Sequence, residues 1–151
     1  MFQTVVIATD GSESAQRAVS VALDIAERFD ATVHALYVVD AGELRGSPAE
    51  IRDDLEDALT NAGGDAVSFV RARATDDDGI RVITAVREGD PAVEIVSYAR
   101  ECDADVIATG TRGRHGDHAF LLGSVAEAIV RRAPMPVLTV RQLTDEERPP
   151  L

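Results

Sequence analysis

Glycine and serine residues near the end of the chain are spaced so that they could bind a phosphate group. The stretch runs from Gly110 to Ser124 (GTRGRHGDHAFLLGS). Glycines at 110, 113 and 116 allow tight turns whose backbone N–H groups point inward without obstruction by side chains. Gly123-Ser124 then begins a predicted helix, whose free N–H groups and dipole favour an anion, and Arg112 and Arg114 add positive charge. An ordinary loop before a serine-capped helix explains the same residues, so both interpretations stay open.

The elements that must position this stretch are strand-like and helix-like segments, which alternate five times. Short β-branched apolar runs predict the strands, and apolar residues at helical spacing predict the helices. The expected strands are Thr4–Thr9, Ala31–Val39, Ile80–Val86, Asp105–Thr109 and Pro136–Val140. The expected helices run from Ala15 to Phe29, from Pro48 past Leu59, from Pro91 to Ala99, and from Val125 to Val130.

Capping signals predict where the helices begin. Ser47-Pro48-Ala49-Glu50 is typical of a capping box with proline at the first helical position, so we expect the second helix to begin there. Ser12 and Asp90 are the expected caps of the first and third helices. Gly63-Gly64 predicts a weak point within the second helix.

The alternation predicts right-handed crossovers and a parallel sheet that helices cover on both faces. An open doubly wound sheet of this kind binds its ligand at the carboxyl ends of the strands, where the strand order reverses. If the order is 3-2-1-4-5, the reversal lies between the first and fourth strands. The loops there are Asp10-Gly11-Ser12 and Gly110-Thr111-Arg112-Gly113, so the two most glycine-marked loops fall at the expected crevice.

The charge balance excludes some classes of partner. Fifteen basic residues against 27 acidic ones give a net charge of −12, which argues against duplex nucleic acid or an anionic membrane. All fifteen bases are arginine, and of the acidic residues 16 are aspartate and 11 are glutamate. Absence of lysine with an excess of aspartate favours a protein adapted to molar salt, from a halophilic, archaeal source. GC-rich codon usage also replaces lysine by arginine, but it does not explain the aspartate excess.

Length and the remaining composition predict one soluble, cytoplasmic domain. The chain has 151 residues, 45% of them hydrophobic, which is enough for a packed core. The longest apolar run, Ala35–Val39, is far shorter than the roughly 20 residues that span a bilayer. The first residues lack the basic region of a signal peptide, and the single cysteine, Cys102, fits a reducing compartment. We expect a domain at residues 1–141 and a polar tail at 142–151.

Three segments resemble the universal stress protein family. Gly110-x2-Gly113-x9-Gly123-Ser124 matches the family's nucleotide-binding pattern, G-x2-G-x9-G-[ST]. The family's order of segments is also present: first VVIATDGSESAQRAV at the start of the chain, then LYVVD at the end of the second strand, and last GSVAEAIVRRAPMPVLTV. The resemblance implies a Rossmann-like, five-stranded α/β fold of order 3-2-1-4-5, of the adenine nucleotide alpha hydrolase-like kind. It also implies ATP binding, with magnesium held through the phosphates, and a homodimer paired through the fifth strand.

The resemblance also implies a set of binding residues. Ala8 and Asp10 would lie along the adenosine, and the backbone of Val38 would contact the adenine edge, although Asp10 also fits a turn and Val38 a core position. The residues implied at the ribose and phosphates are Thr109, Gly110, Arg112, Gly113, Gly123, Ser124 and Val125. Asp117 and Ala119 depart from the family's usual leucine and arginine.

Other functions have weaker support in the sequence. His115 and His118 lack a strong third ligand for a metal site, His34 fits a partly buried strand position, and Cys102 lacks a paired base. A Walker A loop requires lysine, which the chain does not contain. Asp117 and His118 are the possible bases for a slow ATP hydrolase, but no positioned catalytic residue stands out. Binding is therefore favoured over catalysis, and a nucleotide-free dimeric interaction module remains the third alternative.

Overall fold

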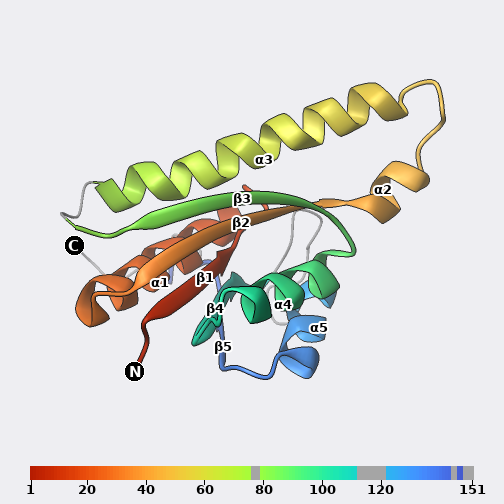
Figure 1. The fold of residues 1–151 in the computed structure, drawn as a ribbon. Coiled ribbons are helices and arrows are strands. Elements are labelled where there is room, and N and C mark those ends of the chain that lie inside the picture. The colour runs from red at the N-terminus through yellow and green to blue at the C-terminus, as the bar shows by residue number, and fades with distance from the viewer. Residues whose placement is uncertain (76–78, 112–121, 144–145, 148–151) are drawn as a thin grey trace.

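A parallel five-stranded sheet lies at the centre of the molecule (Figure 1). The computed structural model describes residues 1–75, 79–111, 122–143 and 146–147. The strands are β1 (Thr4–Ala8), β2 (Thr32–Asp40), β3 (Val82–Gly89), β4 (Val106–Gly110) and β5 (Val137–Val140). Their order is β3-β2-β1-β4-β5, with every neighbouring pair parallel. The expected α/β fold and its strand order are confirmed.

Helices cover both faces of this sheet. In Figure 1, α3 (Arg52–Thr75) lies along one face and α4 (Pro91–Glu101) and α5 (Ser124–Arg132) lie on the other. The helix α1 (Gln16–Phe29), which follows the short 3₁₀ turn η1 (Glu13–Ala15), shares a hydrophobic cluster with α3. Side chains of β2 alternate between the two layers: Tyr37 packs in the α1–α3 cluster, whereas Leu36 and Val38 pack in the α4 cluster. The even-numbered positions of β2 therefore face α4.

The connection after β2 differs from the expectation. A short helix, α2 (Ala41–Arg45), follows β2 directly, and Asp40 caps it by accepting from the backbone N–H groups of Gly42 and Glu43. Ser47 donates its hydroxyl proton to the carbonyl of Glu43 over 2.9 Å, so it serves the end of α2. The predicted start at the Ser47-Pro48 capping box is wrong, because α3 begins at Arg52. The guanidinium of Arg52 donates to the carbonyls of Leu44 and Ser47, which closes the turn between the two helices.

The expected weak point at Gly63-Gly64 is also wrong, because α3 continues unbroken through both glycines. A Cβ atom at Gly63 would lie 2.6 Å from Cδ1 of Tyr37, whose side chain is fully buried on β2. At Gly64 the same atom would meet nothing within 4 Å. Gly63 thus allows α3 to approach the Tyr37 ring closely, whereas Gly64 lies over open space.

The remaining boundaries lie close to the predicted ones. Asp90 caps α4 as expected, its carboxylate accepting from the N–H of Val93 over 3.1 Å. Ser12 precedes the 3₁₀ turn η1 but makes no side-chain capping bond. Strand β3 extends to Gly89, three residues beyond the expected end. In the part of the chain that the structure describes, none of the helices combines the length and apolar character that crossing a membrane demands.

Candidate functional site

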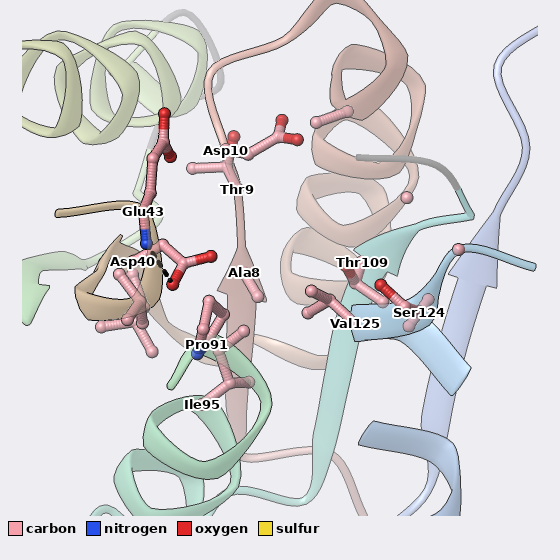
Figure 2. Close-up of a pocket in the computed structure, with 16 residues that line it drawn as sticks. Ala8, Thr9, Asp10, Asp40, Glu43, Pro91, Ile95, Thr109, Ser124 and Val125 are labelled. Carbon is pink, nitrogen blue, oxygen red and sulfur yellow. Dashed lines mark hydrogen bonds between the residues drawn. The ribbon is translucent and has the colours of Figure 1, made fainter. Parts of the chain in front are cut away.

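A cleft of about 420 Å³ opens at the carboxyl ends of β1, β2 and β4, on the face that α4 and α5 cover (Figure 2). This is the place where the strand order reverses, because β1 pairs with both β2 and β4. Its lining comprises Ala8, Thr9, Asp10, Ala15, Leu36, Val38, Asp40, Glu43, Pro91, Ile95, Thr109, Gly110, Gly123, Ser124, Val125 and Ala126. A volume of this size falls within the range of about 300–1,000 Å³ that is usual for small-molecule sites.

Most of the residues that the sequence predicted for a site lie around this cleft. The structure brings together Ala8, Asp10, Val38, Thr109, Gly110, Gly123, Ser124 and Val125. The other two, Arg112 and Gly113, lie outside the described residues. Residues from four separated parts of the chain therefore line one cavity.

Asp10 forms the turn that leaves β1. Its Oδ1 atom accepts hydrogen bonds from the backbone N–H of Ser12 (2.9 Å) and from the Ser12 hydroxyl (2.5 Å). Gly11 between them has a φ of 76°, which favours glycine. Thr9 adds a third bond, its hydroxyl accepting from the N–H of Gly11 over 3.1 Å. Asp10 is therefore a turn residue, as its position after the first strand indicated, and the bonds of the turn hold its carboxylate at the rim of the cleft.

The backbone of β2 extends past the end of β1. The N–H of Thr9 donates to the carbonyl of Leu36 over 3.0 Å, and this is where β1 stops contacting β2. Alternate residues of a strand direct their backbone groups to the same neighbouring strand, so Val38 directs its N–H and carbonyl to the same side as Leu36. Beyond the end of β1 these two groups face the cleft that Val38 lines.

The first turn of α5 forms the opposite end of the cleft. Gly123 is its N-cap, at φ −63° and ψ 157°, and it supplies no side-chain cap. The N–H of Gly123 itself donates to the carbonyl of Thr111 over 2.6 Å, which ties the start of α5 to the end of β4. The N–H groups of the next three residues precede the first intrahelical donor, Glu127, which bonds to the Gly123 carbonyl over 2.9 Å.

Two parts of the cleft wall were missed by the sequence analysis. Asp40 and Glu43 come from the β2–α2 junction, and Pro91 and Ile95 come from the first turns of α4. The two carboxylates had a usable signal, since Asp40 followed by Glu43 has the spacing of a helix N-cap and its third residue. Pro91 and Ile95 had none, because they reach the cleft only through the packing of α4 on the sheet.

The other candidate residues lie away from the cleft. The Nδ1 atom of His34 lies 2.7 Å from the hydroxyl of Tyr98, and burial, with the charge of Arg81, lowers the pKa of this histidine. Burial raises the pKa of the Cys102 thiol, which lies at the end of α4. The position of His34 agrees with the partly buried strand position that the sequence favoured. His115, Asp117, His118 and Ala119 lie outside the described residues. Within the described ranges, no three histidine, cysteine or acidic side chains form a group that could hold a metal ion.

Comparisons with known proteins agree on one family. The model of the universal stress protein family matches residues 1–141. A universal stress protein of Methanocaldococcus jannaschii is 41% identical over 143 residues, covering 94% of this chain and 84% of that protein. The solved structure of UspA from Lactobacillus plantarum is 27% identical with a TM-score of 0.78, covering 93% of this chain and 98% of that chain. A universal stress protein crystallised in complex with cAMP is 27% identical with a TM-score of 0.69, covering 94% and 98%.

Proposed function

The chain belongs to the universal stress protein family, and we propose that it is an ATP-binding member that acts as a nucleotide-dependent stress-response regulator or interaction module in a salt-adapted cytoplasm. The observation that carries the proposal is the cleft at the strand-order reversal. The backbone N–H and carbonyl of Val38 lie at one end of this cleft, and the start of α5, which has no side-chain cap, lies at the other. A relative of known structure forms a complex with cAMP, which is also an adenine nucleotide. We assign binding rather than hydrolysis, because the sequence offers no positioned catalytic residue beyond the candidates Asp117 and His118, which lie outside the described residues.

The end of the cleft at β2 suits an adenine base. Adenine presents a ring-nitrogen acceptor beside an amino donor, and the N–H and carbonyl of Val38 are the complementary pair. Ala8, Leu36 and Ile95 supply apolar surface for the ring. Because the contact uses backbone, the side chain at position 38 has little influence on the choice of base.

The end of the cleft at α5 suits the phosphates. The N–H groups of Ser124, Val125 and Ala126 have no carbonyl partner within the helix and lie at the positive end of its dipole. The hydroxyl of Ser124 adds a donor, and its side chain is exposed. We assign Asp10 to the ribose and Thr109, Gly110, Arg112 and Gly113 to the ribose and phosphates. Magnesium would be held through the phosphates, where it would offset their charge.

Titration calorimetry of ATP–Mg into the protein at molar KCl tests this function directly, and Ser124→Ala is the informative variant. A hydrogen bond to a charged group contributes about 1.5–3 kcal/mol, so we expect a roughly tenfold to hundredfold weaker Kd for ATP. The melting temperature should not change, because Gly123 and not Ser124 is the N-cap of α5.

The matched control is Ser97→Ala, on the exposed face of α4 and outside the cleft. This variant should bind ATP as the unaltered protein does. Absence of measurable ATP binding to the unaltered protein at molar KCl would overturn the proposed function in favour of a nucleotide-free interaction module. Equal affinity of the unaltered protein and Ser124→Ala for ATP would show that the Ser124 hydroxyl does not bond to the nucleotide.

We also propose a homodimer that pairs β5 with its copy. Strand β5 lies at the edge of the sheet, and its outer side has no neighbouring strand among the described residues. Ile107 donates to the carbonyl of Pro136, and Thr111 donates to that of Val140, so the even-numbered positions of β5 face β4. The N–H groups of Val137 and Thr139 therefore face outward, where a two-fold partner could accept them.

Thr139→Pro removes one outward donor and leaves the bonds to β4 intact, so we expect it to weaken or abolish the dimer. Light scattering in high salt should give about twice the 16.1 kDa chain mass for the unaltered protein and a lower mass for the variant. Thr84→Pro is the matched control, because Thr84 is an outward-facing position of β3 at the other edge of the sheet. A monomeric unaltered protein, or equal loss of the dimer in both variants, would exclude pairing through β5.

A further inference from the structure

The cleft holds an acidic group that the assignment of base, ribose and phosphates leaves unused. Asp40 lies at the last position of β2, on the same face as Val38 and two residues beyond it. Its Oδ1 atom accepts from the N–H groups of Gly42 (2.9 Å) and Glu43 (3.4 Å) to cap α2. No described residue donates to Oδ2. Figure 2 shows this second oxygen pointing away from the capping bond, toward the side of the cleft where Ala8 lies.

The two bonds to Oδ1 fix the carboxylate in one orientation. Rotation of the group would remove the cap from α2, so Oδ2 is held toward the cleft. A carboxylate only accepts hydrogen bonds, and it repels a carbonyl oxygen placed opposite it. Among the groups of a bound base, the one that contacts Oδ2 must therefore be a donor.

We propose that Oδ2 of Asp40 accepts a hydrogen bond from the exocyclic amino group of the base and makes the cleft select adenine over a base with a carbonyl at that position. The inference rests on the proposed function, because it assumes that the base lies against the backbone of Val38. An amino group bonded to the Val38 carbonyl retains a second hydrogen, and Asp40 is the acidic side chain next along the same face of β2. Glu43 also lines the cleft, but in Figure 2 its carboxylate extends away from that of Asp40.

Asp40→Asn reverses the chemistry at this one position without removing the cap. The N–H groups of Gly42 and Glu43 need an acceptor, so the amide oxygen takes the place of Oδ1 and the amide NH₂ group takes that of Oδ2. The variant then presents a donor to the base. Inosine triphosphate (ITP) carries a carbonyl where ATP carries the amino group. The backbone of Val38 favours adenine in both proteins, because the N1–H and carbonyl of hypoxanthine do not complement it, so the effect of Asp40→Asn is a shift of the affinity ratio toward ITP.

The experiment is calorimetric titration of ATP–Mg and ITP–Mg into the unaltered protein, Asp40→Asn, Glu43→Gln and Asp90→Asn at molar KCl. The readout is the ratio of the two affinities, because both nucleotides carry the same triphosphate and loss of a negative charge strengthens both equally. We expect Asp40→Asn to lower the preference for ATP roughly tenfold or more. Glu43→Gln should leave the ratio unchanged. Asp90→Asn, which alters the equivalent cap of α4, should also leave it unchanged.

Four results would overturn the inference. An unchanged ratio in Asp40→Asn with ATP still bound overturns the role of Asp40 alone, as does an equal loss of both nucleotides, which would assign Oδ2 to the ribose. A change of ratio in Glu43→Gln in place of Asp40→Asn transfers the role to Glu43. Failure of both nucleotides to bind the unaltered protein overturns the proposed function, and this inference with it.

Discussion

Replacing Gly123 by valine is expected to abolish ATP binding, with a loss of at least roughly a hundredfold in affinity. Gly123 is the N-cap of α5 and lines the cleft beside the free N–H groups of the first helical turn. We expect the two methyl groups of a valine there to obstruct a phosphate that approaches those N–H groups. Calorimetric titration of ATP–Mg at molar KCl measures the loss.

The backbone at this position makes the test specific. A φ of −63° with a ψ of 157° is extended conformation that any residue adopts, so valine brings no backbone strain and acts only through the space it fills. Valine is a poor N-cap, which costs about 1 kcal/mol or less relative to glycine. Gly64→Val, the same exchange over open space on α3, should bind ATP normally. Undiminished binding by Gly123→Val would place the phosphates elsewhere.

The melting temperature is expected to rise steeply with salt, by on the order of 10 °C between about 0.1 M and 2 M KCl. The net charge of −12 makes like charges repel at low ionic strength. Four closely spaced acidic residues near the start of α3, Asp53, Asp54, Glu56 and Asp57, are exposed. The ion pairs between described residues, such as Arg28–Asp24 at 3.1 Å, lie at the surface and offset little of this repulsion. Differential scanning calorimetry across the salt range measures the rise.

A variant distinguishes screening from a general effect of salt. Changing those four residues of α3 to asparagine and glutamine removes four negative charges, so its melting temperature should depend less steeply on KCl. Salting-out of apolar surface would raise both proteins equally. A melting temperature that does not change with salt would favour codon usage over salt adaptation as the reason for the missing lysine.

The fold was predictable because its signal is spread over the whole chain. Strands β1 and β4 are buried on both faces, so their β-branched runs are recognisable without any knowledge of their neighbours. The start of α3 was not predictable, because Ser47 has the residue type of a cap but bonds back to Glu43. Five-residue α2 was missed for a related reason: its cap, Asp40, also ends a strand, and a helix so short has no apolar period.

The candidate site was predictable where one stretch of sequence carries several signals. It was not predictable where a residue reaches the cleft only through the packing of its helix on the sheet. Asp10 and Gly110 lie at strand ends, and Gly123 and Ser124 lie at the start of α5, which the topology brings to the same cleft. Pro91 and Ile95 have the residue types of an ordinary helix start and an ordinary buried helix face, and only the position of α4 relative to β2 brings them into the cleft. Asp40 caps α2, and we propose that it also contacts the base; the sequence indicates at most the cap.

The close approach of α3 to β2 has a consequence for the energetics of ligand binding. Tyr37 is fixed beneath Gly63 on one face of β2, and its neighbour Val38 faces the cleft on the other. The strand segment that we assign to the base is thus held from behind by α3, which does not line the cleft. A rigid edge of this kind loses little conformational entropy when a ligand docks, so more of the contact free energy remains as affinity. Preorganisation of the site thus begins on the opposite side of the sheet.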